Sequence, residues 1–308
     1  MSILYQSDRV ASVSIGEENS PGFKITDLRI AFEIKKTNKS DCNDAKITIT
    51  NLSENSRNLI RKNDLVILKA GYSEAYGEED LFIGYIKQVN NSYDTPNIHT
   101  ILDCKDGIKK LEDSKISLSY DTGFSIKSII QDVIKKLKLS SSIDIDKLNI
   151  PDVEFTNGLS FAGEISHLLN YLCQSAGLEW SFQNNKLKIQ NKDEGDFTDV
   201  VVLSPSSGLI GSPERVEDVE NSRSRAKKDV PGWKIKSLLQ PKIEPGKIIQ
   251  VFCNEINGAF FKVFSVEHNG DTHGKEWESI IKATEVGAVV NDKIYNLNFN
   301  MSNLRPVQ

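Results

Sequence analysis

Apolar and polar residues alternate along much of this chain, and the pattern is clearest in residues 45–106. In residues 46–52 the isoleucines occupy every second position, which places them on one face of a half-buried strand. The alternation is interrupted twice, by a polar segment at 53–63 and by a segment rich in turn residues at 90–97. The pattern predicts an antiparallel β unit with strands at 46–52, 64–68, 81–89 and 99–104.

A second set of strands near the C-terminus follows the same order. Its residue identities mostly differ from the first set, but the type and order of the elements agree. The repeat predicts a mixed, β-rich (α+β) fold with two related antiparallel, barrel-like β domains. Chance similarity between two runs of strands is the alternative. The strands of the second set are expected at 233–239, 246–251, 258–266 and 278–284.

Between the two β units the hydrophobic period becomes helical. Residues 126–137 repeat isoleucine, valine and leucine at helical spacing, and a second helix is expected at 161–176, with Ser160 as its N-cap and Gly177 as its stop. A hairpin follows, in which Trp180 and Phe182 alternate on one strand before a turn at 183–185. These aromatic residues are interpreted as core, and a ligand platform is the alternative.

These patterns divide the chain into four parts. The first β domain begins with the alternating strand 28–35 and a turn at 38–41. The second begins where strand character returns at 200–203. The expected boundaries are 1–107 for the first β domain, 108–196 for an α/β insertion, 197–289 for the second β domain and 290–308 for a C-terminal extension.

A dense run of charges interrupts the second β domain at 214–230. Its first half is acidic, its second half is basic, and it offers almost no apolar residues to bury. The run is interpreted as a solvated, mobile loop. As an alternative, its basic half, which contains Arg223 and Arg225, docks on an acidic neighbour.

Composition narrows the class of function. The 308 residues include 38 Lys and Arg against 43 Asp and Glu, a formal net charge of -5, so no global basic field exists to hold nucleic-acid phosphates. The N-terminal residues do not resemble a secretion signal, and no apolar run is long enough to span a bilayer. The sequence therefore predicts a protein made in a cytoplasm, with no sequence-specific nucleic-acid binding and no membrane span.

The four cysteines, Cys42, Cys104, Cys173 and Cys253, are far apart and lack zinc-site or redox spacing. They are expected to be thiols, with Cys104 in a strand and Cys173 on the apolar side of a helix.

One short segment near the C-terminus carries the best candidates for chemistry. His268, Asp271 and His273 offer imidazoles and a carboxylate that are possible metal ligands. Their spacing matches no helical metal motif, and residues 269–270 (Asn-Gly) are instead interpreted as a hairpin turn. No phosphate-binding glycine loop, nucleophile elbow or Cys/His catalytic signature is found, so no catalytic residue, resident metal or cofactor is expected.

An ordered set of short strings resembles one protein family, the baseplate hub proteins of contractile phage tails and related contractile injection systems (late control protein D-like). The resemblance covers most of the chain. It rests on the set rather than on one decisive motif. The strings are ITNLS at 49–53, VILKAGY at 66–72, LFIGYI at 81–86, LSPSSGLIGSP at 203–213, SLLQP at 237–241, EPG at 244–246, VEHNGDT at 266–272 and EW at 276–277.

The resemblance implies a structural protein rather than an enzyme. It implies a homotrimer in which two tube-like β domains per chain form a ring of pseudo-sixfold symmetry. Such a ring joins the tail tube protein to the central spike protein and to other baseplate proteins, in the tail baseplate of a virion assembled in the host cytoplasm. The candidate interface residues are Leu81, Phe82, Ile83, Tyr85, Phe260, Phe261, Arg223 and Arg225.

The implied ring has a channel through which genome or cargo passes. A basic wall would bind DNA and retard its passage, so we expect a neutral or acidic wall, with lysines 35–36 and 109–110 facing solvent or neighbouring proteins. An alternative function is an envelope-directed carbohydrate-binding or hydrolytic tail module, which would need a cleft with paired carboxylates. A threefold ring with a central channel would support the hub, whereas a monomer with an acidic cleft would support the alternative.

Overall fold

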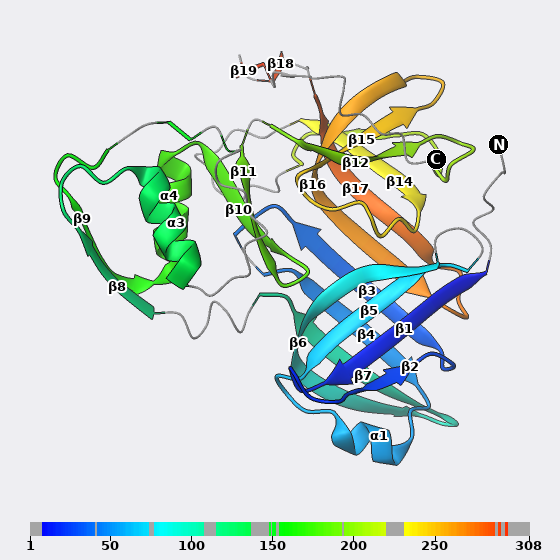
Figure 1. Cartoon of the computed structure of the whole chain (residues 1–308). Helices are drawn as coiled ribbons and strands as arrows, with labels where there is room; N and C mark the ends of the chain where they lie inside the picture. The colour runs from blue at the N-terminus through cyan, green and yellow to red at the C-terminus, as the bar shows by residue number, and fades with distance from the viewer. Residues whose placement is uncertain are drawn as a thin grey trace.

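Strands make up more than half of the residues that the computed structural model describes, and thirteen of these strands belong to one sheet (Figure 1). The structure describes residues 8–40, 42–73, 77–107, 115–136, 148, 150–151, 154–192, 194–219, 231–286, 289–290 and 293–294. The β-rich fold class expected from the alternating pattern is confirmed.

The N-terminal half of the sheet has the strand order β3-β4-β7-β6-β5-β1-β2. Its buried isoleucines, valines and leucines form a hydrophobic core with Phe32 and Phe82. A short helix, α1 (Glu54–Leu59), lies in the polar connection after β4 and is capped by Ser53. The strands are β1 (Arg9–Gly16), β2 (Phe23–Ile25), β3 (Ile30–Thr37), β4 (Asp44–Thr50), β5 (Leu65–Tyr72), β6 (Gly77–Asp94) and β7 (Asn97–Lys105).

The C-terminal half has the order β13-β14-β17-β16-β15-β12, and a second core lies under it. β16 also pairs antiparallel with β3, so the two halves form one sheet. Trp277 reinforces this join by packing edge-on against Phe32, with ring centroids 5.5 Å apart. The strands are β12 (Asp196–Leu203), β13 (Glu214–Val216), β14 (Gly232–Leu238), β15 (Lys247–Phe252), β16 (Asn257–Asp271) and β17 (Trp277–Glu285).

The two halves repeat the same strand order. The antiparallel series β4-β7-β6-β5 corresponds to β14-β17-β16-β15. The β-bulges correspond as well: β6 has extra residues at Leu81 and Lys87, and β16 has them at Gly258 and Phe264. The halves differ at one edge, because β1 is antiparallel to β5 whereas β12 is parallel to β15.

No pairing among the described strands closes this sheet into a barrel, since the path ends at β13 and β2. The closed form of the two expected β domains is therefore not seen in the single chain. Each half instead bends around its own core, because the first and last parts of its longest strand have different neighbours. β6 pairs first with β5 and then with β7, and β16 pairs first with β15 and then with β3.

The insertion lies to one side of the sheet and has its own core (Figure 1). Trp180 and Phe182 are buried in this core, as the interpretation of the aromatic residues predicted. The hairpin turn is confirmed at Asn184 and Asn185, which both have positive φ. The elements are β8 (Lys115–Tyr120), α3 (Ile126–Lys136), β9 (Leu159–Glu164), α4 (Ile165–Ser175), β10 (Leu178–Gln183) and β11 (Lys186–Asn191); β18 (Val289–Val290) and β19 (Lys293–Ile294) follow the second half.

Three predicted boundaries are wrong. The charged run 214–230, interpreted as a loop, begins with a strand, because Glu214–Val216 pairs with β14 as β13. The second helix begins at Ile165 rather than at 161, and Ser160 lies in β9, because Leu159–Glu164 pairs with β8 before the helix starts. The turn expected at 90–97 is also mostly strand, because β6 continues to Asp94 and pairs with β7 up to Asn97. Strand pairing outweighed the local signals in the last two places, with the next strand β7 at 90–94 and with the earlier strand β8 at 159–164.

Candidate assembly site

The candidate metal ligands do not form a cluster. His268 is completely buried, its Nδ1 lies 2.8 Å from Ser279 Oγ, and burial lowers its pKa to about 3, so the ring is neutral at physiological pH. The Asp271 carboxylate binds Arg29, with Oδ2 and Nη2 2.6 Å apart, and His273 contacts Thr272. No group of three or more His, Cys, Asp or Glu that could hold a metal occurs in the described part of the chain.

The hairpin turn predicted at residues 269–270 is wrong. Both residues belong to β16, whose pairing with β17 and with β3 continues to the strand end, and the connection to β17 lies at 272–276. Gly270 is required there for packing, because a Cβ atom would lie 2.3 Å from the Phe32 ring. The sequence pattern could not show this, since the glycine signals a close approach rather than a turn.

Four of the eight candidate interface residues are buried within the chain itself. Leu81, Phe82 and Phe261 have no exposed surface, and Tyr85 is 2% exposed. The Tyr85 hydroxyl donates to Glu18 and accepts from Asn185 of the insertion. Ile83 and Phe260 are half-buried, whereas Arg223 and Arg225 lie outside the described residues.

No disulfide joins the four cysteines, and Cys104 and Cys173 are buried, as expected from their places in a strand and on a helix. Burial raises the pKa of each of these two thiols to about 12, so both are packing groups rather than nucleophiles.

The exposed face of the joined sheet carries a ladder of opposite charges. The ladder crosses the four adjacent strands β16, β3, β4 and β7. Each residue lies opposite the next in the order Glu267, Lys35, Asp44 and Lys105. Opposite charges on neighbouring strands stabilise a sheet modestly, and their electrostatic potentials largely cancel at a distance from the sheet. This polar face therefore continues across the boundary between the two halves without a large net charge.

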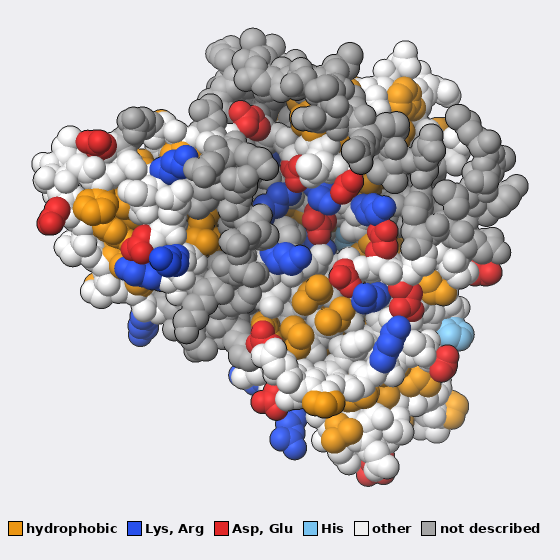
Figure 2. Space-filling view, in the orientation of Figure 1, with side chains coloured by type: hydrophobic (Ala, Val, Ile, Leu, Met, Phe, Trp, Pro, Cys, Tyr) orange, Lys and Arg blue, Asp and Glu red, His pale blue; other side chains and the backbone are white. Residues whose placement is uncertain are grey.

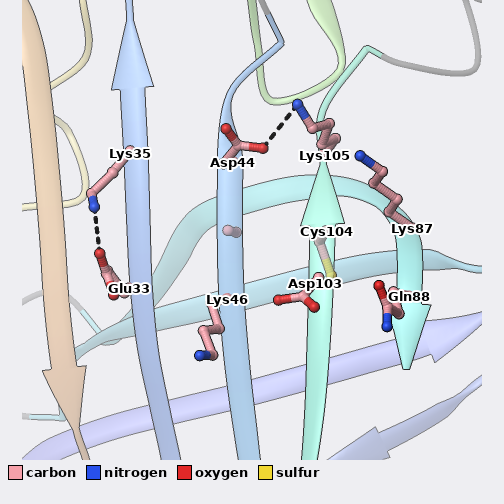
Figure 3. Close-up of a pocket in the computed structure, with 10 residues that line it drawn as sticks. Glu33, Lys35, Asp44, Lys46, Lys87, Gln88, Asp103, Cys104 and Lys105 are labelled. Carbon is pink, nitrogen blue, oxygen red and sulfur yellow. Dashed lines mark ion pairs between the residues drawn. The ribbon is translucent and has the colours of Figure 1, made fainter. Parts of the chain in front are cut away.

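A shallow groove of about 440 Å³ lies on this polar face, and Figure 3 shows its lining side chains on adjacent strands. Lys35 Nζ lies 2.6 Å from Glu33, whose hydrogen bond raises the pKa of the lysine, and Lys105 Nζ lies 3.1 Å from Asp44. Lys46, Lys87 and Asp103 also line it. On the face in Figure 2, acidic and basic side chains are likewise interspersed rather than separated by sign.

A second polar cluster is buried where the insertion meets the sheet. The Lys36 side chain has no exposed surface, and its Nζ lies 3.1 Å from Asn184 Oδ1 and 3.8 Å from Glu244. Burial lowers the pKa of Lys36. Burial by itself would raise the pKa of Glu244, but the ammonium groups of Lys36 and Lys247 outweigh it and hold that pKa below its ordinary value. The cluster therefore joins β3, the β10–β11 turn and the segment before β15.

Asn43 and Asp106 form the other half of this buried cluster. The Asn43 amide group donates to Asp106 Oδ2 at 2.9 Å and to the Phe182 carbonyl at 2.7 Å, and its backbone N–H donates to Asp106 Oδ1 at 2.8 Å. Burial raises the pKa of Asp106 to about 7, against the opposing effect of the Asn43 hydrogen bonds. Lys262 and Glu179, whose charged atoms lie 2.7 Å apart, make a further link between β16 and β10.

The sequence interpretation missed this cluster. It grouped Lys36 with Lys35 as an exposed pair, whereas Lys36 points to the core face and only Lys35 is exposed. The signal was present in the alternation, because Phe32, Ile34 and Lys36 occupy one face of the same strand. The expectation for lysines 109–110 falls outside the described residues.

No protein-family model and no curated protein sequence matches the chain. Among solved structures, the 43 kDa tail protein of prophage MuSo2 from Shewanella oneidensis matches with a TM-score of 0.59 at 10% identity, covering 89% of this chain and 98% of that one. A tail protein from Neisseria meningitidis MC58 matches with a TM-score of 0.60 at 10% identity, covering 91% and 98%.

A third solved structure comes from E. coli. It is the c3393 protein, a component of the type VI secretion system with structural similarity to the T4 bacteriophage tail proteins gp27 and gp5. It matches with a TM-score of 0.58 at 12% identity and covers 89% of this chain and 76% of that one. The chain therefore has the β-rich fold that these phage tail and secretion-system proteins share.

Among the described residues, no helix combines the length and apolar character needed to cross a bilayer.

Proposed function

We propose that the chain is the structural baseplate hub of a contractile tail or of a related injection system. Three copies form a ring, in which each copy contributes two quasi-equivalent β units. The observation that carries the proposal is the repeated strand order of the two halves with its matched bulges, because such a repeat gives three identical chains six similar units. The proposed domain boundaries are those predicted from the sequence.

The polar face of the joined sheet is the proposed wall of the channel. It runs without a break from β14 through β17, β16, β3 and β4 to β7, so one chain supplies a long arc of wall. Its charges alternate along the ladder Glu267, Lys35, Asp44 and Lys105. The alternation covers the part of the wall from β16 to β7, whereas Lys282 of β17 lies opposite Lys234 of β14. The alternating part holds no array of cations for DNA phosphates and is not expected to retard passage. Lys35 is then part of the wall, held beside Glu33.

The proposed partners follow from the same assembly. A ring with sixfold-like β units on one side fits a sixfold tail tube protein, and its true threefold symmetry fits a central spike protein. In the proposed ring, other baseplate proteins contact the side that carries the insertion, which lies beside the sheet in the single chain (Figure 1). The proposed location is the tail baseplate of the virion, after assembly in the host cytoplasm.

A structural role, rather than an enzymatic one, is the proposal. The alternative, a carbohydrate-binding or hydrolytic tail module, requires a cleft with two available carboxylates. The groove on the polar face does contain Glu33, Asp44 and Asp103, but Glu33 and Asp44 are each held by a lysine. This favours the structural role.

Electron microscopy of the purified full chain, alone and with its tail tube protein, tests the proposed function. We expect threefold rings with an open centre that stack on the end of the tube. Single particles without rings under both conditions, together with cleavage of cell-wall glycans, would contradict the proposal and favour the alternative.

A further inference from the structure

The join between the two halves of the sheet is an edge-to-edge strand pairing with a definite construction. β16 pairs with β17 along one side. On its other side, residues 257–262 pair with β15, and after the bulge at Phe264, residues 265–271 pair antiparallel with β3. In this pairing His268 lies opposite Ile34. One long strand therefore contributes its first part to its own half and its last part to the neighbouring half.

β6, the counterpart of β16, is built in the same way, but among the described strands its last part has no counterpart of β3 as a second partner. It pairs with β7 along one side and with β5 along residues 77–85 of the other. Beyond the bulge at Lys87, the β5 side of the strand meets no other strand in the described part of the chain. Every residue of 87–94 except Val89 is exposed, and Tyr93 keeps 71% of its surface. An open, exposed strand edge of this kind is a template for another strand.

β13, the counterpart of β3, supplies the complementary open edge. β3 pairs with β4 on one side and with β16 on the other, whereas β13 pairs with β14 alone among the described strands. Glu214 and Arg215 are exposed there. Each chain thus carries both members of the join, one at each end of the repeated series, and neither edge pairs with another described strand.

We propose that the last part of β6 in one copy pairs antiparallel with β13 of a second copy of this chain, which reproduces between copies the β16–β3 join found within one copy. The proposal rests on the proposed ring of copies and assigns its subunit contact. Because the two surfaces differ, the contact is head-to-tail, and rotation after each step closes it into a ring.

The register follows from the matched bulges. When the bulge residue Lys87 of β6 is aligned with the bulge residue Phe264 of β16, Asn91 falls at the position of His268. The strand pairs carry this alignment from β7 and β17 to β4 and β14, and from there to β3 and β13. Arg215 of β13 then falls at the position of Ile34 of β3. His268 and Ile34 are opposite each other, so Asn91 of one copy is expected opposite Arg215 of the next. Ser92 then lies opposite Glu214.

Cysteine cross-linking tests this register. The full chain carrying Asn91→Cys and Arg215→Cys is oxidised mildly and run on a non-reducing gel. We expect linked dimers and trimers. Each single substitution controls for the native thiols, and the pair Val89→Cys with Arg215→Cys controls for register. That pair is displaced by about 7 Å along the strand, which exceeds the reach of a disulfide, so it should give a much weaker ladder.

Two further measurements separate this contact from the ring itself. Mixing differently tagged chains that carry one substitution each should give linked dimers only, which shows that the contact joins two copies. Native mass spectrometry of the same samples reports the assembly. A trimer that forms no cross-link in this register overturns the contact but leaves the ring. Linked dimers from a sample with no trimer support the contact and contradict the ring. A monomer with no cross-link overturns both.

Discussion

Glu267 of β16 lies directly opposite Lys35 of β3 in the row of residues that joins the two halves of the sheet. On the other face of the same strands, Val266 and His268 are buried beside Lys36 and Ile34. If one strand slipped by one residue against the other, its charged residue, Glu267 or Lys35, would turn into the core and its buried residue, His268 or Ile34, would turn to solvent. The alternation therefore fixes the register of the join. The two halves therefore act as one structural body with a polar face and a buried face.

Adjacent lysines on β3 should have very different effects on stability. Lys36→Ala leaves the carboxylate of Glu244 and the Asn184 amide without their buried cation, so the free energy of unfolding should fall by about 3 kcal/mol. Lys35→Ala removes an exposed ion pair with Glu33 and should change it by no more than about 0.5 kcal/mol. Urea denaturation of both variants measures this difference. Equal effects would mean that Lys36 is not the buried partner described.

The Asn43 side chain should be needed for docking of the insertion. Asn43→Ala removes hydrogen bonds to Asp106 and to the Phe182 carbonyl and leaves both acceptors buried. A loss of about 3 kcal/mol is expected, together with earlier proteolysis of the insertion. Asn254→Ala, at an exposed position, is the matched control and should leave both measurements unchanged. An effect of the control as large as that of Asn43→Ala would contradict the assignment.

Asp106 should make stability depend on pH in an unusual direction. Its pKa is raised to about 7 by burial, against about 3.9 for an unfolded aspartate, so the folded state holds the proton more tightly. The stabilising contribution is complete below about pH 4 and is lost as the pH rises to about 7.

The comparison with Asp106→Asn isolates this effect, because other carboxylates such as Asp271 have lowered pKa values and act in the opposite direction. The free energy of unfolding of the wild type, minus that of the variant, should fall by up to about 4 kcal/mol between pH 4 and pH 7. A difference that stays constant over this range would show that Asp106 is ionised throughout.

Much of the fold could be predicted from alternation alone. All eight strands expected in the two sets, and the helix beginning at Ile126, are present. The boundaries failed where pairing with a distant strand overrode local residues, as at Ser160 in β9 and at residues 269–270 in β16. A local pattern carries no information about such a partner.

The candidate site was harder to predict than the fold. Alternation shows that Lys36 shares a face with Ile34, but only the insertion explains why a lysine is tolerated there, since Asn184 arrives from 148 residues away. The candidate interface aromatics illustrate a related ambiguity. Apolar strands such as residues 81–86 look the same in sequence whether they cover the chain's own core or a neighbour, and here they mostly cover the core.

The charge balance of the proposed channel wall should keep DNA binding weak. The wild-type assembly is expected to bind duplex DNA weakly at physiological salt. The triple variant Glu33→Lys, Asp44→Lys and Asp103→Lys makes the groove basic and should bind more tightly, with a steeper loss of affinity as salt rises. Fluorescence anisotropy over a salt series measures both. Tight, salt-sensitive binding by the wild-type ring would contradict a non-binding wall.

The central claim is that three copies of this chain form one closed ring, and native mass spectrometry of the full chain across a concentration series tests it most directly. We expect a species of three times the 34.4 kDa chain mass that grows with concentration and is not followed by larger open assemblies. A chain that stays monomeric throughout, and also forms no rings with its tail tube protein present, would contradict it.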